Sequence, residues 1–542
     1  MQAWLRRAFS QTDAPPWQGK AHRLWVWFLA ACLALYGTYA LYLSQSALFV
    51  TPADTLAALL WALPVFGLVL WLLVRLWRVP GLPAFAATRR QLDARVFVGG
   101  TLVTLGILGV YLLAADPGGV SVDSAVQWTQ ANTGVFINWH PAFHTLLIRL
   151  VALVRPSYTF AVAVQCAAFS VALGYLLATL HAWGAKAAWL LPLAALTVAA
   201  PIVGHTMMYL WKDNAMTIGV TLLTAQAVNL YLSRGRWLEK RLNAVAFGLT
   251  LAFVTLVRHN GLLFSIPLLL TALLTCRAQL WRALLSALTL LATLWLVLGP
   301  LYGALEVTYP QNGLEEAIGL PMTVISNIRK QNPDALDAQT RAFTDRMADD
   351  AGWAAYQLDN YNSIKFGRTR ALIAHTAPAE VLRMAAGAAK ADPRGAFLAV
   401  NGVTDLVWGL EDAGSANVRV RNAGNLPGVL PTSGLRREVG AALKAFIAAP
   451  LQLAPLGWYY GNIGVSFLLL LALCLRAIRR GGTRALLLCL PTLLYNLGTM
   501  AVLCGEDARF FSFSPLLCTL LLPVLLRDAP PTQEPHGEKA PA

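Results

Sequence analysis

Charged residues are scarce in this chain: Asp, Glu, Lys and Arg together make up 13% of its 542 residues. A typical soluble domain has about 25%. Hydrophobic residues reach 57%, so the composition excludes an ordinary soluble protein and indicates one embedded in a membrane lipid bilayer. The net charge of +15 does not indicate a nucleic-acid partner. The basic residues gather at the ends of apolar runs, where cytoplasmic retention of Lys and Arg accounts for much of the excess.

Cysteine is also scarce, with seven in the chain. All of them lie in or at the ends of apolar runs, and none lies in the hydrophilic stretch 306–449. The sequence therefore predicts no disulfide framework. A cleavable signal peptide is not expected either, because the first apolar run, 24–43, follows a basic segment and is long enough to span a membrane. We expect that run to be an anchor.

Apolar runs are what the chain has in abundance. A spanning helix needs roughly 20 apolar residues, and many runs reach or approach that length, alone or with their flanks. Two shorter runs, 243–257 and 262–276, are joined by the sequence RHNG. The longer runs are residues 24–43, 56–77, 96–114, 158–180, 187–208, 214–232, 283–302, 464–475, 485–503 and 511–526. The sequence thus predicts an all-α polytopic membrane protein with about 12 transmembrane helices.

Basic clusters in short loops predict the orientation. They lie at 6–23, 75–95, 234–241, 277–282 and 476–484. These clusters share one side of the membrane if both termini are cytoplasmic. The external side then receives the loop 115–155, the corners 209–213, 258–261 and 505–509, and an insertion at 303–460. Because the crossings between that loop and 234–241 must be even in number, we expect 143–154 to lie on the outer face as a juxtamembrane helix.

This orientation divides the chain into five parts. Residues 1–95 form an N-terminal cytoplasmic segment and two extra transmembrane helices, and 96–302 form the main membrane core. The insertion at 303–460 is predicted to be external and mostly helical, with breaks at prolines. Residues 461–527 hold the C-terminal transmembrane helices. The tail, 528–542, is polar and rich in proline, so we expect it to be disordered in the cytoplasm.

One polar segment, residues 117–149, interrupts the apolar first part of the chain. Its unusual side chains are Asp123, Trp128, Asn138, Trp139, His140 and His144. A mere connector does not need them, so we interpret the segment as a reaction site at the membrane face. Asp123 precedes a helix-like stretch and is therefore a candidate N-cap. It is equally a candidate general base for an attacking hydroxyl, and the two roles are compatible.

His140 and His144 have the i, i+4 spacing found in some zinc sites. Pro141, however, is expected to begin a helix and to leave His140 as its cap. The sequence also has no HExxH motif and no clear third ligand. We therefore predict no metal site here. The two imidazoles and Trp139 are expected to line a polar substrate pocket.

Two corners carry cations at the expected external ends of spans. In VRHNG, the residues Arg258, His259 and Asn260 break an apolar stretch, and a basic charge there contradicts the positive-inside trend. Either Arg258 extends to lipid headgroups, or the break presents a cation and backbone donors to a lipid-linked phosphate. We favour the second. Lys212 and Asp213 form either an interfacial salt bridge or a phosphate-binding lysine beside an aspartate that orients it.

The motifs VSVDSAVQWTQ, INWHPAFHTLL, LWKDNAM, VRHNG, IGLPMTVISNI and DNYNSIKFG occur in this order over roughly residues 96–370, and a looser match lies at EDARF. Together they resemble an uncharacterised bacterial membrane family of the GT-C superfamily of integral-membrane glycosyltransferases. That superfamily includes protein O-mannosyltransferases and lipid A aminoarabinose transferases. Each motif is weak alone, but their order and spacing are fairly specific.

This resemblance implies a GT-C-like hexosyltransferase in a bacterial cytoplasmic (inner) membrane. The enzyme would transfer a sugar from a polyprenyl-phosphate carrier to a glycan, lipid or protein acceptor of the cell envelope at the periplasmic face. By the family's pattern, Asp123 is the general base and the anomeric carbon is inverted. Many relatives have paired acids in this loop, whereas this chain reads Asp123-Ser124. The second carboxylate is then either Asp116 or Asp213, and the case for a divalent metal cofactor is weaker.

The chemistry of the residues agrees with that implication. A polyprenyl monophosphate leaving group develops negative charge as the glycosidic bond breaks, and cations in a low-dielectric pocket stabilise it. Arg258, Lys212 and Arg509 are the available cations. The alternative is a transporter or flippase of a lipid-linked or anionic substrate, which also uses broken helices and intramembrane cations. The sequence shows no two related halves, and its polar external loop favours an enzyme.

Overall fold

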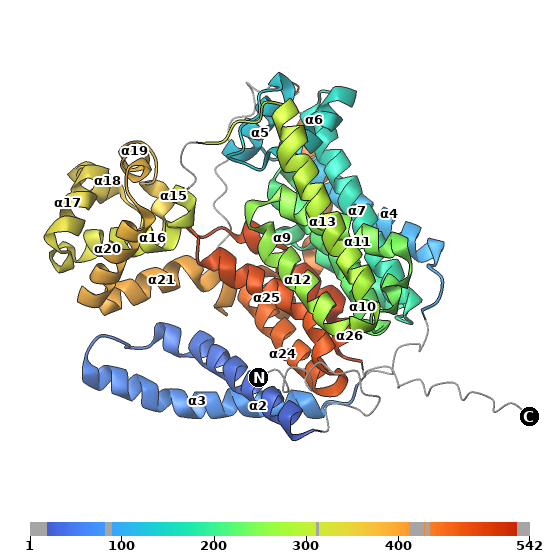
Figure 1. Cartoon of the computed structure of the whole chain (residues 1–542), viewed down its shortest axis with the longest axis horizontal. Helices are drawn as coiled ribbons and strands as arrows, with labels where there is room; N and C mark the ends of the chain where they lie inside the picture. The colour runs from blue at the N-terminus through green and yellow to red at the C-terminus, as the bar shows by residue number, and fades with distance from the viewer. Residues whose placement is uncertain (1–18, 82–88, 311–313, 411–427, 429–433, 528–542) are drawn as a thin grey trace, which may run out of the picture.

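The computed structural model describes residues 19–81, 89–310, 314–410, 428 and 434–527. Over those residues the fold is all-helical, with two isolated β-bridges, Gly119–Tyr209 and Ile137–Thr308, in place of a sheet. The predicted tail at 528–542 lies outside the described residues. Figure 1 shows a helical bundle, a separate group of helices beside it, and a long hairpin packed below.

Seven described helical segments are long and apolar enough to cross a membrane. Their main helices are α2 (Lys20–Leu41), α3 (Pro52–Arg78), α4 (Ala94–Ala115), α7 (Tyr158–Ala182), α10 (Lys212–Leu232), α13 (Leu280–Leu296) and α26 (Phe513–Leu525). The number rises to nine if two bent pairs each count as one span. The chain is therefore a helical protein suited to multiple membrane crossings, and the prediction of about 12 spans is confirmed only in this coarser form.

Each of the two bent pairs consists of helical segments joined at a sharp turn. Helix α8 (Ala187–Ala199) continues into α9 (Pro201–Gly204) and η3 (Thr206–Met208) after a bend of 68°. Helix α22 (Gly434–Ala448) and its 3-10 extension are followed by α23 (Ala454–Gly461) after a bend of 103°. Helix α22 packs lengthwise against α4. The last part of the predicted insertion thus lies on the bundle, apart from the helices that precede it.

The bundle contains six further helices among the described residues. They are α5 (Val122–Thr133), α6 (Ala142–Val154), α11 (Arg241–Val257), α12 (Leu262–Thr275), α24 (Ile463–Gly481) and α25 (Leu486–Met500). The predicted break at RHNG is real: α11 ends at Val257, and a 3-10 turn, His259–Gly261, leads into α12. At Gly261 an added Cβ would lie 2.0 Å from the carbonyl oxygen of Val254, so this corner needs glycine.

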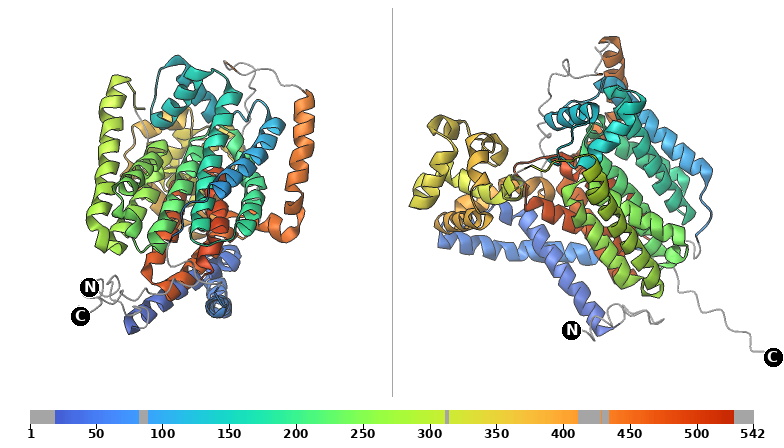
Figure 2. Two further views of the ribbon diagram at one scale, coloured as in Figure 1. Left: turned by 90° about the vertical axis from the view of Figure 1, so that its right-hand side faces the viewer. Right: turned by 45° about the horizontal axis from the view of Figure 1, so that its top comes forward.

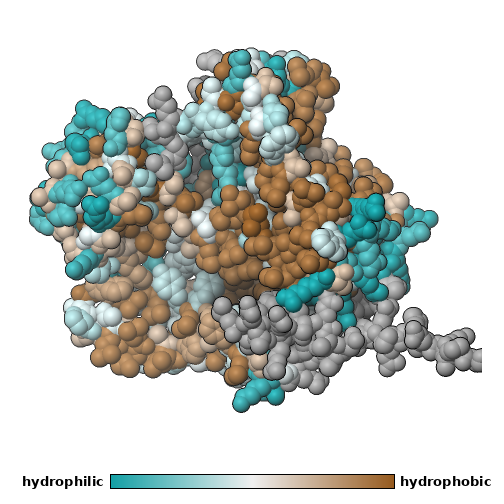
Figure 3. Space-filling view, viewed as in Figure 1, coloured by the Kyte–Doolittle hydropathy of each residue, from teal (hydrophilic) through white to brown (hydrophobic). Residues whose placement is uncertain are grey.

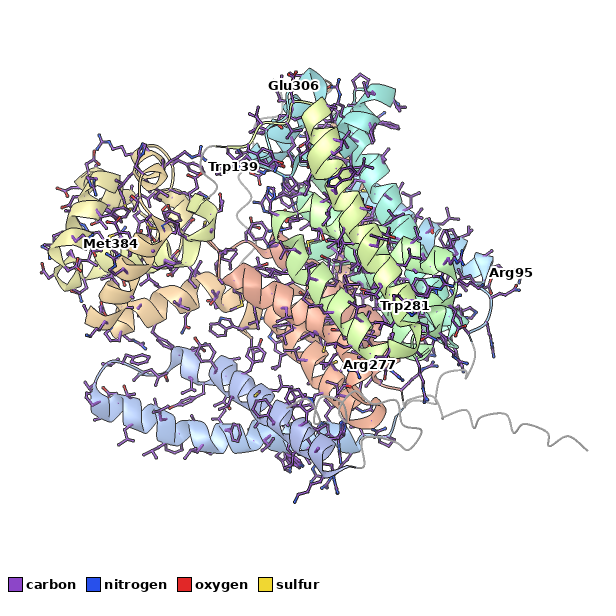
Figure 4. The ribbon with its side chains drawn as sticks, in the orientation of Figure 1. Arg95, Trp139, Arg277, Trp281, Glu306 and Met384 are labelled. Atoms are coloured by element: carbon purple, nitrogen blue, oxygen red, sulfur yellow. The ribbon has the colours of Figure 1, made fainter. Side chains whose placement is uncertain are left out.

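The bundle has two chemically different ends. At one end, basic side chains cap the carbonyls of neighbouring helices: Arg476 donates to Leu525, Arg480 to Val79, and Arg484 to Thr275. The opposite end holds the first loop and the corners near 211, 258 and 509. Figure 4 shows this separation, with Arg95 and Arg277 remote from Trp139 and Glu306. We call these the basic end and the site end.

The insertion contains a compact helical module with its own core. Its helices are α15 (Leu314–Ala317), α16 (Gly319–Gln331), α17 (Ala338–Met347), α18 (Asp350–Ala355), α19 (Arg368–Ala374), α20 (Pro378–Ala391) and α21 (Pro393–Trp408). Buried side chains such as Met322, Phe343, Trp353 and Val381 form that core. The surface of the module is largely hydrophilic, whereas the bundle presents a broad hydrophobic face (Figure 3).

The bundle exposes large apolar side chains as a bilayer-embedded surface does. On α13, Leu288, Leu291 and Trp295 are between 61% and 70% exposed. Figure 2 shows α13 along one flank of the bundle. On α3, Leu56, Trp61 and Leu63 are similarly exposed. Hydrocarbon is the solvent that suits these faces, which supports the predicted bilayer setting.

Candidate functional site

The site end is built from five separate elements of the chain. Asp123 comes from the first turn of α5, His140 from the loop before α6, and Lys212 from the first residue of α10. Arg258 comes from the break between α11 and α12, and Arg509 from the 3-10 turn before α26. The structure therefore brings together residues that are up to 386 positions apart in the sequence. We call these five residues, together with Asp213 and Asp507 that pair with the two arginines, the charged cluster.

The N-cap of α5 is Ser121, so the expectation that Asp123 caps this helix is wrong. The side chains of Ser121 and Ser124 form a capping box, with each hydroxyl accepting from the other residue's backbone N–H. Trp211 donates its indole N–H to Ser121 Oγ at 2.7 Å. These bonds fix the start of α5. Because serine does the capping, the carboxylate of Asp123 is left for other contacts.

Asp123 accepts a hydrogen bond from Arg509. The distance from Arg509 Nη1 to Asp123 Oδ2 is 2.9 Å, and the other carboxylate oxygen lies 4.0 Å from His140 Nε2. Burial alone would raise the pKa of Asp123, but the charges of Arg509 and Lys212 outweigh it and hold that pKa well below its usual range. The carboxylate is therefore ionised at physiological pH.

His140 lies between Lys212 and Asp123. Lys212 Nζ donates to His140 Nδ1 at 3.0 Å. Burial, reinforced by the charge of Lys212, lowers the pKa of His140 to about 3, so the ring is neutral. An Nδ1 that accepts leaves the proton on Nε2, the nitrogen that faces Asp123. Pro141, and not His140, occupies the N-cap position of α6, where Asn138 Oδ1 accepts from the backbone N–H of Ala142.

Arg258 and Asp213 form a buried ion pair. Arg258 Nη1 contacts Asp213 Oδ1, and both side chains are less than 10% exposed. Arg258 Nε also donates to Asn260 Oδ1 at 2.6 Å, and Asn260 Nδ2 donates to Thr499 Oγ1 at 2.9 Å. The guanidinium lies over the ring of Phe510 at 4.3 Å. Arg258 thus points into the protein and does not extend to lipid headgroups.

Arg509 connects the parts of the cluster. Besides Asp123, its Nε lies 2.6 Å from Asp507 Oδ2 and 3.9 Å from Asp213 Oδ2. Its guanidinium packs over Trp211 at 5.0 Å. Sequence reasoning named Asp213 as a possible second carboxylate but missed Asp507. The signal was present, because Asp507 stands two residues before Arg509 in the EDARF corner.

Three other predicted site residues face different neighbours. His144 accepts from Gln127 Nε2 at 3.0 Å and is buried behind α5. Trp139 lies under Arg370 of the insertion, whose guanidinium is 4.7 Å from the ring centre. His259 is exposed and bonds to the backbone at Asn138 and Trp139. These residues line the borders of the cluster and are not in its centre.

Arg370 connects the insertion to the border of the site. Its Nη2 donates to Glu315 Oε1 at 2.6 Å, and the Glu315 side chain is fully buried. The neighbouring Glu316 pairs with Lys365 at 2.6 Å. Further along, the backbone N–H of Asn362 donates to the carbonyl of Cys504. Gly319 of IGLPM also lies against the backbone of Leu503, so the motifs IGLPM and DNYNSIKFG both lie beside the EDARF corner.

Two remaining candidates have structural positions. Trp128 is fully buried and packs edge-on against Tyr158, with ring centres 5.4 Å apart. It therefore has no exposed face for a sugar. Asp116 is the C-cap of α4, and its carbonyl accepts from Arg437 Nε at 3.2 Å. Within the described ranges, no group of three or more His, Cys, Asp or Glu side chains is arranged to hold a metal ion.

The charged cluster can bind an anion, orient it between three cations, and offer a carboxylate beside it. Lys212, Arg258 and Arg509 supply the positive charge, and Asp123 supplies a carboxylate bonded to Arg509. Ionised side chains held in a largely buried site act on developing charge more strongly than they do in water.

No protein-family model, curated protein or solved structure matches the chain.

Proposed function

We propose that this protein is a GT-C-like glycosyltransferase that uses a polyprenyl-phosphate-linked sugar as donor. Its acceptor would be a glycan, lipid or protein of the cell envelope. The proposal includes about 12 transmembrane helices, a bacterial cytoplasmic membrane, cytoplasmic termini and a site on the periplasmic face. The observation that carries it is the convergence of Asp123 with Lys212, Arg258 and Arg509 at one end of a hydrophobic bundle.

The three cations would bind the donor phosphate. Negative charge grows on that phosphate as the bond to the sugar breaks, so fixed cations stabilise the transition state more than the ground state. Arg258 and Arg509 are oriented by aromatic rings and carboxylates, and Lys212 by His140. Once the phosphate is bound, little further reorganisation is needed when the charge develops. A donor phosphate at the end of membrane-spanning helices can keep its polyprenyl chain in the bilayer.

Asp123 would accept the proton of the attacking hydroxyl. In the ligand-free cluster its hydrogen bond to Arg509 makes it a weak base, since that cation holds its pKa low. A donor phosphate competes for the same guanidinium. Once Arg509 turns toward the phosphate, Asp123 loses its main cationic partner and its proton affinity rises. Donor binding would thus activate the base, and an acceptor would be deprotonated only in the loaded site.

The border of the site would contact the acceptor or the sugar. Trp139 and Arg370 form a stacked pair between the first loop and the insertion, beside the exposed ring of His259. Aromatic faces and guanidinium groups are common partners of sugar rings and anionic groups. The insertion therefore contributes a wall to the site, which gives the external module a role in acceptor choice.

A transporter or flippase remains the second candidate because Arg258 lies at a break between two short apolar helices. Transporters place such breaks at their substrate sites. The two functions differ in covalent chemistry. A transporter leaves the sugar–phosphate bond of its cargo intact, whereas a glycosyltransferase breaks it.

The proposed function is tested by changing the base. Asp123→Asn keeps the shape of the side chain, and Ser121 still caps α5. Loss of a general base should slow transfer from a synthetic polyprenyl-phosphate sugar by about 100-fold or more. The matched control is Asp334→Asn, which alters an exposed aspartate–arginine pair on the insertion. Parental activity in purified, correctly folded Asp123→Asn would rule out this residue as the base.

A further inference from the structure

Asp507 is held by one residue at two points. Its Oδ1 accepts the backbone N–H of Arg509 at 3.1 Å, and its Oδ2 lies 2.6 Å from Arg509 Nε. The same guanidinium donates through Nη1 to Asp123. Asp507 therefore orients Arg509 toward the centre of the cluster. Any ligand that draws Arg509 away also removes the principal cationic partner of Asp507.

The cluster is balanced in charge. Its cations are Lys212, Arg258 and Arg509, and its carboxylates are Asp123, Asp213 and Asp507. His140 adds no charge because its ring is neutral. A phosphate that enters this largely buried group brings negative charge without a matching cation. Uncompensated charge is costly at a desolvated site, so protonation of one carboxylate would offset it.

The three carboxylates differ in their ability to take that proton. When Arg509 turns to the phosphate, Asp123 still has the charge of Lys212 nearby, which holds its pKa low. Asp213 is 2% exposed and has Arg258 as a close partner. The charged groups near Asp507 are Arg509 on its own loop, Asp123 from α5 and the more distant Arg258 from the break after α11. Across the loop, Gly505 lies against the uncharged Asn360 of the insertion.

Burial also favours Asp507 as the carboxylate that takes up the proton. It raises the pKa of the Asp507 carboxyl, although Arg509 and Arg258 oppose the shift. A phosphate on Arg509 would weaken that opposition and add a like charge nearby. Both changes favour the protonated form of Asp507. Its side chain is also 26% exposed, so a proton can reach it from water.

We propose that Asp507 takes up a proton when a phosphate monoester binds to Arg509, so that an anionic lipid phosphate and a proton enter this site together. This inference rests on the charged cluster being the phosphate site of the proposed function. It does not depend on any chemical step after binding. Affinity for the phosphate should fall as the pH rises, whereas a cluster that preferred the more highly charged phosphate would bind better at higher pH.

The test is calorimetric binding of farnesyl phosphate to the purified full chain at about pH 8, where a phosphate monoester with a second pKa near 6 is already dianionic. Buffers with different ionisation enthalpies report the protons exchanged. The parent should take up as much as about one proton for each ligand bound. Asp507→Asn mimics the neutral form, so it should bind the ligand with no uptake and with an affinity that no longer falls with pH. Asp334→Asn, the exposed control, should behave as the parent does.

Several outcomes would overturn the inference. Binding by the parent without proton uptake would do so, as would uptake that persists in Asp507→Asn. Loss of uptake in Asp213→Asn, with retention in Asp507→Asn, would assign the proton to Asp213 instead. If Asp507→Asn does not fold, the parent still tests the inference, because a dissociation constant that does not rise with pH would overturn it. Failure of farnesyl phosphate to bind would overturn both proposals. Proton-coupled binding without sugar transfer would overturn only the proposed function.

Discussion

At the residue scale, the cluster is defined by how its cations are held. Each has a fixed neighbour: Lys212 has His140, Arg258 has Asp213, and Arg509 has Asp123 and Asp507. Removal of one partner from such a pair leaves a charge without compensation in a poorly solvated place. Single substitutions therefore change both stability and chemistry. Paired substitutions are needed to separate the two.

The neutral state of His140 gives a prediction about pH. Its folded pKa of about 3 is below the ordinary 6.5, so the ring binds no proton between about pH 5 and about pH 8. His140→Gln should reduce kcat/KM by a factor that stays constant across that range. Matched pH profiles of the parent and the variant provide the measurement. A ratio that changes near pH 6.5 would show that the imidazole titrates there.

The contributions of the Arg258–Asp213 pair to stability and to catalysis can be separated by comparing one single and one double variant. Arg258→Ala leaves the buried Asp213 carboxylate poorly compensated and should destabilise the protein by about 3 to 5 kcal/mol. Arg258→Met combined with Asp213→Asn removes both charges, so it should recover much of that stability. It should still lower kcat/KM by a factor equivalent to about 2 to 4 kcal/mol, because the phosphate has lost a cation.

Thermal unfolding and transfer kinetics of the parent, Arg258→Ala and the double variant check this prediction. A double variant that is stable and transfers sugar at the parental rate would reduce Arg258 to a structural residue. A double variant as unstable as Arg258→Ala would contradict the account of charge compensation.

Much of the charged cluster could be predicted from the sequence, since a charge in an apolar context stands out. Arg258, Lys212 and Asp213 stand out on that ground, and Asp123 stands out as an acid in the polar segment 117–149. Asp507 was not, because an acid beside an arginine in a polar corner resembles an ordinary surface pair. The sequence analysis placed Asp123 at the N-cap of α5 and His140 at that of α6. The structure has Ser121 and Pro141 in those positions. Which of several nearby residues caps a helix depends on backbone angles that composition does not specify.

At the element scale, short helices and breaks explain part of the difference between the predicted and observed numbers of spans. Apolar runs were recognised correctly, but α11 and α12 have 17 and 14 residues and are too short to qualify alone. Hydropathy measures apolar length and does not show where the backbone turns. The bends of 68° and 103° in two other pairs are further examples. Breaks of this kind occur in membranes where they are buried or line a site.

The N-terminal hairpin has a role that sequence analysis did not suggest. Arg394 of α21 donates from Nη1 to the carbonyls of Ser46 and Leu48, at 3.0 and 2.9 Å. Asn401 donates to the carbonyl of Ser44 at 3.0 Å. The loop between α2 and α3 therefore holds the insertion, which in turn forms a wall of the candidate site.

Arg394→Ala tests this attachment. Hydrogen bonds from a charged donor contribute about 1.5 to 3 kcal/mol, and about 1.4 kcal/mol corresponds to a tenfold change in a local opening equilibrium. Amide hydrogen exchange in residues 42–50 should accelerate about tenfold or more. Arg341→Ala is the control, because Arg341 lies on the insertion surface and its ion-pair partner Asp334 is exposed. Unchanged exchange in that loop would show that other contacts hold the insertion.

At the scale of the whole molecule, the polar corners predicted to share one membrane face do meet at one end of the bundle. The basic loops meet at the other end, where arginines cap helix carbonyls. The pattern of charge along the sequence was sufficient for this grouping because lysine and arginine follow a side of the membrane. The packing of the insertion was not predictable, since it depends on long-range contacts such as those of Arg370 and Arg394.

The central claim is that the charged cluster breaks the bond between a sugar and a lipid phosphate. Its most direct measurement follows a polyprenyl-phosphate sugar with separate labels on the sugar and the lipid, in sealed vesicles containing the purified protein and an envelope extract as acceptor. We predict that the sugar label leaves the lipid in vesicles with the parent protein and stays on it with Asp123→Asn. Movement of both labels together across the membrane, with the bond intact, would contradict the account and identify a transporter.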